Sequence, residues 1–295
     1  MTAKQQLFVG IDGGGTKCKA IVVNNHGQIL GHGVAGPANA FQHLTLAQQS
    51  IIDATVLALD DAGLSHMSLT SLVVGAGLAG VNIDASRQAM LNWQHPFAQF
   101  YLTTDMAIAC LGAHQAEPGA IIICGTGSAG YAHNGIRELH LGGHGFAHGD
   151  ICSGAWFGLR AVEQVLLSSD GFQPATQLQQ CLFDQLKVAN INQLIAKSAG
   201  QGAGFYGQLA KQVFFCAEQG DQLAMNIVEQ GLSYFCQMVD ALTDFQQGKI
   251  ALIGGLVPLL TPHLPNRVKT VLSRPQRPPE YGAILFAQRQ YVDEG

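Results

Sequence analysis

One unit of sequence occurs twice in this chain, and this repetition limits the folds that the chain can adopt. The first copy has an apolar run from Leu7 to Asp12, three glycines, and a second apolar run from Cys18 to Val23. An Asn-His-Gly turn then leads into a third run, from Gln28 to Val34. Apolar, β-prone runs separated by tight turns predict a three-stranded antiparallel meander.

The same order returns in the middle of the chain. A strand from Ala120 to Gly125 is followed by a glycine turn, a strand at Tyr131–His133, an Asn-Gly turn and a return strand at Ile136–Leu141. A chain of 295 residues is also longer than one hydrophobic core usually holds. We therefore expect an α/β fold of two related lobes with a cleft between them.

The segments between and after the two copies alternate helical and strand patterns. In the first lobe, the expected elements are a helix over Leu46–Ala62, a strand from Leu69, a helix over Asp84–Trp93 capped by its aspartate, a strand over Phe97–Leu102 and a helix over Met106–Ala113. In the second lobe, helices are expected over 155–167, 174–186, 191–197, 203–217 and 221–245, and a strand from Lys249. A last helix, Glu280–Tyr291, is expected to return to the first lobe.

The expected domains follow from this reading. The N-terminal lobe spans 1–115, with 281–295 packing back on it, and the C-terminal lobe spans 116–280.

Composition excludes several classes of partner and compartment. The net charge is -5, and no basic run is longer than a pair, so we expect no nucleic acid and no anionic membrane as partner. The N-terminal segment has no apolar core of an export signal, and no stretch has 18 apolar residues without a breaker. Seven scattered cysteines without a C-x-x-C pair are typical of reduced thiols. We expect a cytoplasmic protein.

The first glycine turn has the composition of an anion site. Gly13, Gly14 and Gly15 let backbone N–H groups approach a phosphate closely, and Thr16 and Lys17 add polar donors. The spacing matches neither a Walker A box nor a G-x-G-x-x-G motif that opens a helix. The preceding Asp12 can hold Mg²⁺ directly or through its water. An ordinary hairpin turn capped by this aspartate is the alternative.

The second copy carries a similar turn, made of Gly125, Thr126, Gly127 and Ser128. Two such turns on opposite lobes can hold one polyphosphate from both sides during phosphoryl transfer. A third glycine turn, Gly254–Gly255, lets backbone lie against an adenine or ribose; a plain strand-to-helix turn is its alternative.

Asp105 is the candidate general base. A hydroxyl group attacks phosphorus readily when a carboxylate accepts its proton, and Asp105 follows a predicted strand and two threonines. A helix N-cap is the other role that an aspartate at this position can have.

Three histidines and a cysteine, at positions 140, 144, 148 and 152, are spaced four residues apart. This spacing would align a metal site on a helix, but the glycines between them argue against a helix. We therefore favour a substrate loop over a zinc site. Asp150 and the glycines of this loop, Gly143 among them, suit the hydroxyl groups of a polar substrate.

Six motifs in this order resemble N-acetylglucosamine and glucosamine kinases, which are grouped with the BadF/BadG-type ATPases in the actin/hexokinase/Hsp70 superfold. The motifs are Gly10–Lys17, Thr103–Asp105, Gly125–Ser128, Gly142–Trp156, Gly254–Gly255 and Pro279–Ala283. The resemblance implies a duplicated ribonuclease-H-like core that uses ATP and Mg²⁺. It also implies that Asp105 is the base, that Thr104 belongs to the same substrate segment, and that Asn39 binds sugar. Relatives usually carry Trp near position 144 and Glu-Gly after the aspartate, where this chain has His144 and Ile151-Cys152.

The expected reaction is ATP-dependent phosphorylation of the 6-hydroxyl of an amino sugar. N-acetylglucosamine is favoured because Asn39 suits an acetamide and because Ile151 replaces an acid. Glucosamine is the alternative acceptor. A BadF-type iron-sulfur activator, with Cys124 and Cys152 as ligands, and a non-catalytic sugar sensor are alternatives of other classes. The number of subunits stays open, a homodimer included.

Overall fold

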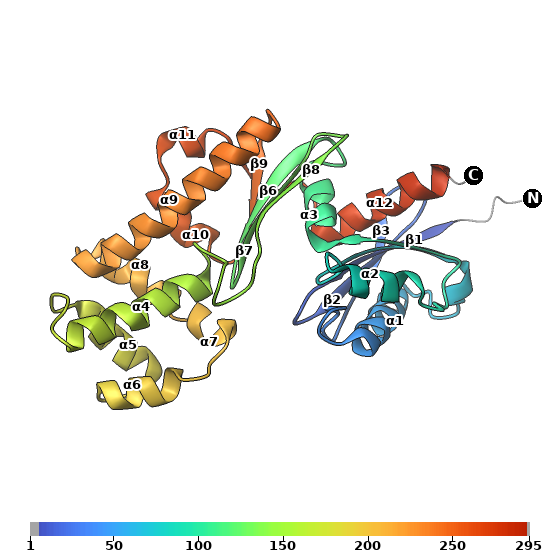
Figure 1. Cartoon of the computed structure of the whole chain (residues 1–295). Coiled ribbons are helices and arrows are strands. Elements are labelled where there is room, and N and C mark those ends of the chain that lie inside the picture. The colour runs from blue at the N-terminus through green and yellow to red at the C-terminus, as the bar shows by residue number, and fades with distance from the viewer. Residues whose placement is uncertain (1–5, 294–295) are drawn as a thin grey trace, which may run out of the picture. The chain divides into compact units, whose positions relative to one another are not determined.

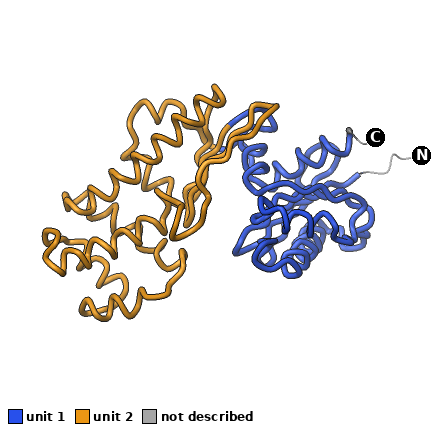
Figure 2. The backbone as a smooth tube through the Cα atoms, in the orientation of Figure 1, with its two compact units in different colours: residues 1–119, 275–295 blue, residues 120–274 orange. Residues whose placement is uncertain are grey.

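The computed structural model describes residues 6–293, so the N-terminal residues on which the export prediction rests lie mostly outside it. The chain divides into two compact units (Figure 2). Unit 1 comprises residues 1–119 and 275–295, and unit 2 comprises residues 120–274. In the described range, no helix is long and apolar enough to cross a bilayer.

Unit 1 is built on a five-stranded mixed sheet in the order β3-β2-β1-β4-β5. Its strands are β1 (Leu7–Gly13), β2 (Cys18–Val23), β3 (Ile29–Ala35), β4 (Leu72–Leu78) and β5 (Gln99–Thr104). The first three strands are antiparallel, which confirms the first predicted meander. Strands β4 and β5 run parallel to β1, so the C-terminal ends of these three strands meet at one edge of the sheet.

Helices cover both faces of this sheet (Figure 1). They are α1 (Leu44–Asp61), α2 (Asp84–Leu91), α3 (Asp105–Ala113) and α12 (Pro279–Asp293). Val9 and Ile11 of β1 belong to the core that contains the buried residues of α1 and α2, whereas Phe8 packs with residues of α12. Helix α12 lies very close to β1, because a Cβ atom on Gly10 would be 2.0 Å from the backbone oxygen of Glu280.

Several predicted boundaries in unit 1 were wrong by a few residues. The strand expected from Leu69 begins at Leu72, after a short 3-10 turn that Ser68 caps. Asp84 does not cap α2; it is the first residue of the helix, and Ile83 precedes it. The helix ends at Leu91, two residues before Trp93.

The strand predicted over Phe97–Leu102 is displaced along the chain. Phe97 stays outside β5 because it packs with Trp93 and Phe100 in an aromatic cluster. Strand β5 therefore starts at Gln99 and runs to Thr104.

Unit 2 has a second five-stranded sheet, in the order β10-β9-β6-β7-β8. Its strands are β6 (Gly119–Cys124), β7 (Ser128–His133), β8 (Glu138–Gly142), β9 (Ile250–Ile253) and β10 (Leu272–Ser273). Strands β7 and β8 form an antiparallel hairpin, and β9 runs parallel to β6. The strands of the second copy are therefore confirmed, with small shifts in their ends.

The rest of unit 2 is helical. The helices are α4 (Gly154–Ser169), α5 (Gln177–Leu186), α6 (Ile191–Ser198), α7 (Ala203–Gly207), α8 (Ala210–Glu218), α9 (Gln222–Phe245), α10 (Val257–Leu260) and α11 (Asn266–Lys269). Their buried side chains form one core with those of β6, β7 and β9. The carboxylate of Asp221 holds two helices in place, because it caps α9 and accepts hydrogen bonds from Thr176 and Gln177 at the start of α5.

Two predicted helices of unit 2 were wrong in extent. The helix predicted over 203–217 is two helices, which are separated at Gln208–Leu209. The side chain of Leu209 is buried in the core at this break. The helix predicted from Pro174 starts at Gln177, because Thr176 takes the N-cap position and its hydroxyl accepts from the Leu178 N–H group.

Candidate functional site

The first glycine turn joins β1 to β2 in unit 1. Gly13 is buried, and the Gly14 N–H group donates to the Lys17 carbonyl at 3.0 Å, which closes the turn. Gly15, Thr16 and Lys17 are exposed. The turn therefore has a fixed base and an accessible tip with a hydroxyl and an ammonium group, which suits an anionic ligand.

Asp12 lies beside this turn, on the sheet face that α3 and α12 cover. Burial raises the pKa of Asp12 from 3.8 to about 6, and the negative charges of Glu280 and Asp105 add to this effect. Lys19, opposite Asp12 on β2, and Lys17 lower the pKa. A carboxylate that is crowded by other carboxylates is a favourable partner for a divalent cation, because the cation offsets their mutual repulsion.

Asp105 is the first residue of α3 and follows the C-terminal end of β5. The N-cap of this helix is Thr104, whose side-chain oxygen accepts a hydrogen bond from the Ala107 N–H group at 3.1 Å. The expectation that Asp105 itself could be the N-cap is therefore wrong. One carboxylate oxygen of Asp105, Oδ1, accepts from the Met106 N–H group at 2.9 Å. Asp105 and Asp12 lie near the same edge of the sheet, since β1, β4 and β5 are parallel.

Asn39 has a clear local role in the loop after β3. Its side-chain oxygen accepts hydrogen bonds from the N–H groups of Phe41 and Gln42, at 3.0 and 3.1 Å. This is the turn role that an asparagine often has. The amide oxygen of Asn39 is thus engaged within the loop, and sugar binding by this residue stays a prediction.

The second glycine turn joins β6 to β7 in unit 2 and is tied to the start of α4. The Gly125 N–H group donates to the Gly127 carbonyl at 2.9 Å. In return, the Gly154 and Ala155 N–H groups donate to the carbonyls of Gly125 and Thr126, at 2.8 and 3.1 Å. The turn is therefore anchored at the N-terminus of a 16-residue helix, whose dipole favours an anion nearby.

Asp150 holds the loop that follows β8 against this turn. Its carboxylate accepts from the Gly145 N–H group at 3.2 Å, and the backbone of Ser128 also favours its charged form. The Ser128 hydroxyl donates to the Ile151 carbonyl at 2.7 Å, and the Gly143 N–H group donates to the Ser128 carbonyl at 3.0 Å. Burial raises the pKa of Asp150, and the backbone groups of Gly145 and Ser128 partly offset that effect.

The three histidines and Cys152 do not form a metal centre. His140 lies on β8, with its ring 4.9 Å from that of Tyr131, whereas His144 and His148 lie in the loop beyond β8. A hydrogen bond with the Cys124 thiol, together with burial, raises the pKa of Cys152. Within residues 6–293, no group of three or more His, Cys, Asp or Glu side chains is arranged to hold a metal ion directly.

A pocket of about 370 Å³ lies at the second and third glycine turns, within unit 2. Its lining residues are Gly125, Thr126, Gly154, Gly207, Ala210, Lys211, Gly255, Leu256 and Leu259. Gly254 has a φ of +123°, and a Cβ atom there would be 2.1 Å from the Cys124 oxygen, so only glycine fits between β9 and β6. The pocket combines glycine backbone, leucine side chains and one lysine, a mostly apolar lining with few polar groups that is typical of small-molecule sites.

The sequence analysis did not find Lys211. It assigned positions 203–217 to one helix, whereas the break between α7 and α8 places Gly207, Ala210 and Lys211 at the pocket. The signal that could have found this segment is the spacing of Gly202, Gly204 and Gly207, which is unfavourable in a helix interior.

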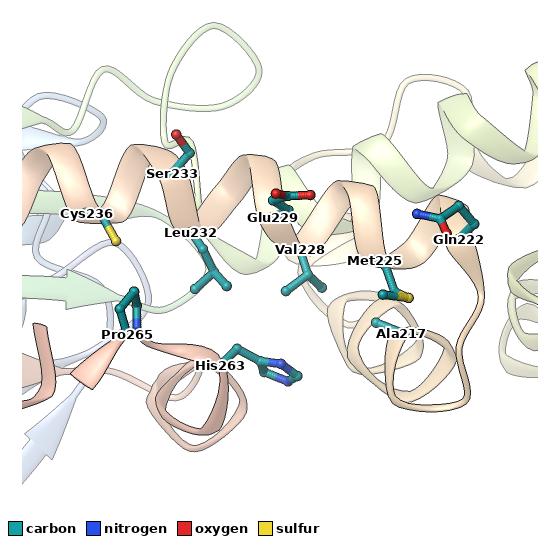
Figure 3. A pocket seen from close by; sticks show the side chains of 10 residues that line it. All are labelled: Ala217, Gln222, Met225, Val228, Glu229, Leu232, Ser233, Cys236, His263 and Pro265. Atoms are coloured by element: carbon teal, nitrogen blue, oxygen red, sulfur yellow. The ribbon is translucent and has the colours of Figure 1, made fainter. Parts of the chain in front are cut away.

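A wider groove of about 640 Å³ lies elsewhere in unit 2, along α9 (Figure 3). Met225, Val228 and Leu232 project from α9 toward the segment that carries His263 and Pro265. The groove includes none of the glycine turns and none of the predicted site residues. We therefore assign the candidate site to the glycine turns and not to this groove.

Two α/β units, each with a meander that contains a glycine turn, define the duplicated ribonuclease-H-like fold of the actin-like ATPases. The model of the BadF/BadG/BcrA/BcrD ATPase family matches residues 9–287. The chain belongs to this family.

Three relatives are informative. A glucosamine kinase of Vibrio cholerae is 36% identical over 280 residues, which cover 95% of each chain. An N-acetyl-D-glucosamine kinase of Dictyostelium discoideum is 24% identical over 256 residues, 81% of this chain and 79% of that one. A solved structure from Chromobacterium violaceum, described as a candidate N-acetylglucosamine kinase, superposes with a TM-score of 0.87 at 28% identity and covers 96% of this chain and 99% of that one.

Proposed function

We propose that this protein is an ATP-dependent kinase that transfers the γ-phosphoryl group to the 6-hydroxyl of an amino sugar, with N-acetylglucosamine as the acceptor. The observation that carries the proposal is the packing of the Asp150 carboxylate on the second glycine turn. This contact joins the predicted sugar loop to the predicted phosphate turn within one unit. The relatives named above support the same reaction class.

The nucleotide is proposed to occupy the 370 Å³ pocket of unit 2. Leu256 and Leu259 offer apolar surface for the base, and Gly255 leaves open space beside it, since no atom lies within 4 Å of where its Cβ atom would be. Thr126 and the backbone of its turn are proposed to bind phosphate oxygens, and Lys211 supplies a positive charge. Gly13 to Lys17 of unit 1 are likewise proposed to bind phosphate oxygens.

Asp105 is proposed to act as the general base. As the sugar oxygen attacks the γ-phosphorus, its O–H bond breaks and the proton passes to the Asp105 carboxylate, while the bond to the β-phosphate oxygen breaks and ADP leaves. Because Thr104 already caps α3, a proton transfer at Asp105 leaves the helix start intact. Asp12 would hold Mg²⁺ through water, and the ion would offset the charge of the phosphates.

The loop that carries Gly143 and Asp150 is proposed to bind the ring hydroxyls. The Asp150 carboxylate is half-buried, and the Gly145 N–H group holds its orientation, so its remaining lone pairs can accept from sugar hydroxyls. Thr104 and Asn39 are proposed as further sugar contacts in unit 1, the latter through its amide nitrogen.

Glucosamine is the second candidate acceptor, and the 36% identical relative from Vibrio cholerae favours it. The 28% identical solved structure and the relative from Dictyostelium discoideum favour the acetylated sugar. An iron-sulfur activator is disfavoured by burial: Cys124 and Cys152 are each 1% exposed and lie within the core of unit 2, where they could not bridge a cluster to another subunit.

An acceptor panel tests the proposal. ADP release is measured with N-acetylglucosamine, glucosamine, N-acetylmannosamine and glucose, each with ATP and Mg²⁺, and NMR of the product identifies the phosphorylated oxygen. We expect the highest kcat/KM with N-acetylglucosamine and a 6-phosphate product. A higher value with glucosamine would select the second candidate, and no turnover with any sugar would contradict the kinase function and favour a sensor.

A further inference from the structure

Glu280 is a buried carboxylate that the proposed reaction does not use. It is the second residue of α12 and is only 8% exposed. Its oxygen Oε2 is buried and has no hydrogen-bond partner in the part of the chain that the structure describes. Leaving such a polar atom unpaired is unfavourable, and more so when the group is ionised. A ligand that supplies a donor to this oxygen would remove this penalty.

The position of Glu280 points to the ligand. The backbone oxygen of Glu280 lies against Gly10, two residues before Asp12 on β1. Side chains two residues apart on a strand share one face of the sheet, so Asp12 extends from the face on which Glu280 is packed. Of the charged groups that act on Asp12, Glu280 has the largest effect, ahead of Lys19 and Asp105.

Glu280 has no cationic partner among the residues that the structure describes, because no lysine, arginine or histidine within residues 6–293 forms an ion pair with it. Glu280 lies in the first turn of α12, where the helix dipole stabilises a negative charge. The dipole does not, however, supply a hydrogen-bond donor to Oε2. Two carboxylates that approach each other in a buried site favour a cation or its bound water between them.

We propose that Glu280 is a positioning residue that accepts a hydrogen bond from the water shell of the divalent cation held by Asp12. Mg²⁺ keeps several of its water ligands in proteins and is usually bound by only one or two carboxylates together with phosphates. A contact through water also agrees with the absence, among the described residues, of three side chains arranged to hold a metal directly. The inference rests on the proposed function, because that function supplies the nucleotide-bound cation.

The test is cation binding by Glu280→Gln, which keeps the shape of the side chain and removes its charge. Mn²⁺ replaces Mg²⁺ as the probe, and free Mn²⁺ is measured by electron paramagnetic resonance in the presence of ADP. We expect the apparent dissociation constant of Mn²⁺ to rise about tenfold, while ADP binding in EDTA is unchanged. Glu117→Gln is the matched control, because Glu117 is an exposed glutamate of the same unit, and it should bind Mn²⁺ like the wild type.

Unchanged Mn²⁺ binding by Glu280→Gln would overturn the inference. A lower melting temperature in EDTA together with unchanged Mn²⁺ binding would also overturn it, because that result assigns Glu280 a purely structural role. The experiment contains no sugar, so its outcome is independent of the acceptor panel. If the wild type binds Mn²⁺ and ADP but phosphorylates no sugar, the proposed function fails and the role of Glu280 can still be measured.

Discussion

The Asp150 carboxylate lies directly against Gly127, since a Cβ atom on that glycine would be 2.7 Å from Asp150 Oδ2. This contact fixes the distance between the loop that we propose for the sugar and the turn that we propose for the phosphate. It also explains why position 127 has no side chain.

Gly127→Ala should displace the Asp150 carboxylate. The new methyl group overlaps a carboxylate whose position is held by the Gly145 N–H group, so we expect the free energy of unfolding to fall by about 1 kcal/mol. Gly125→Ala is the control, because no atom lies within 4 Å of its Cβ position and neither glycine has a positive φ. Chemical denaturation of the ligand-free variants measures the difference. Equal losses in both variants would argue against the close contact.

Asp105→Asn should strongly reduce turnover and leave the fold intact. The amide cannot accept the proton of the hydroxyl, so we expect kcat to fall by about 10²–10⁴-fold. Its side-chain oxygen can still accept from the Met106 N–H group, and Thr104 still caps the helix, so the melting temperature should change little. Asp84→Asn is the control and should retain full activity, because Asp84 is the first residue of α2 as Asp105 is of α3. Near-normal turnover of the Asp105 variant would remove it as the base.

Lys211→Ala should weaken the use of ATP more than that of the sugar. Loss of one charge-assisted hydrogen bond corresponds to about a tenfold rise in the KM for ATP, while the KM for the sugar stays the same. Lys249→Ala is the control, since the Lys249 ammonium group donates to the Thr270 carbonyl and does not line the pocket. An effect on the sugar KM alone would place the nucleotide elsewhere.

Asp150→Asn should change how stability depends on pH. Because burial raises the pKa of Asp150 in the folded chain, the unfolded chain loses this proton at a lower pH than the folded chain does. Ionisation of Asp150 therefore lowers the free energy of unfolding as pH rises above the ordinary aspartate pKa. We expect the variant to be more stable than the wild type near pH 7, by a small margin because the group is half-exposed, and equally stable near pH 3. A variant that is less stable at pH 7 would contradict the direction of this shift.

The local elements of the fold could be predicted because short-range patterns specify them. Both meanders and their glycine turns appear in the sequence as apolar runs with breakers, and the structure confirms them in unit 1 and unit 2. The ends of helices and strands differ from the prediction where tertiary packing competes with local sequence preference. Phe97 shows this, because its aromatic neighbours keep it outside a strand that its own sequence favours.

Some residues of the candidate site could likewise be predicted from the sequence, and others could not. The sequence by itself indicated Asp12 and the residues of both glycine turns, and it indicated Asp105 at a strand-to-helix junction, because polar and glycine residues at the ends of apolar runs form a local pattern. Only the tertiary structure decided that Glu280 packs beside Asp12, that Thr104 caps α3, and that Lys211 reaches the glycine pocket. The physical reason is that burial, charge and contact between distant segments depend on how helices pack on sheets, and a local pattern does not carry that information.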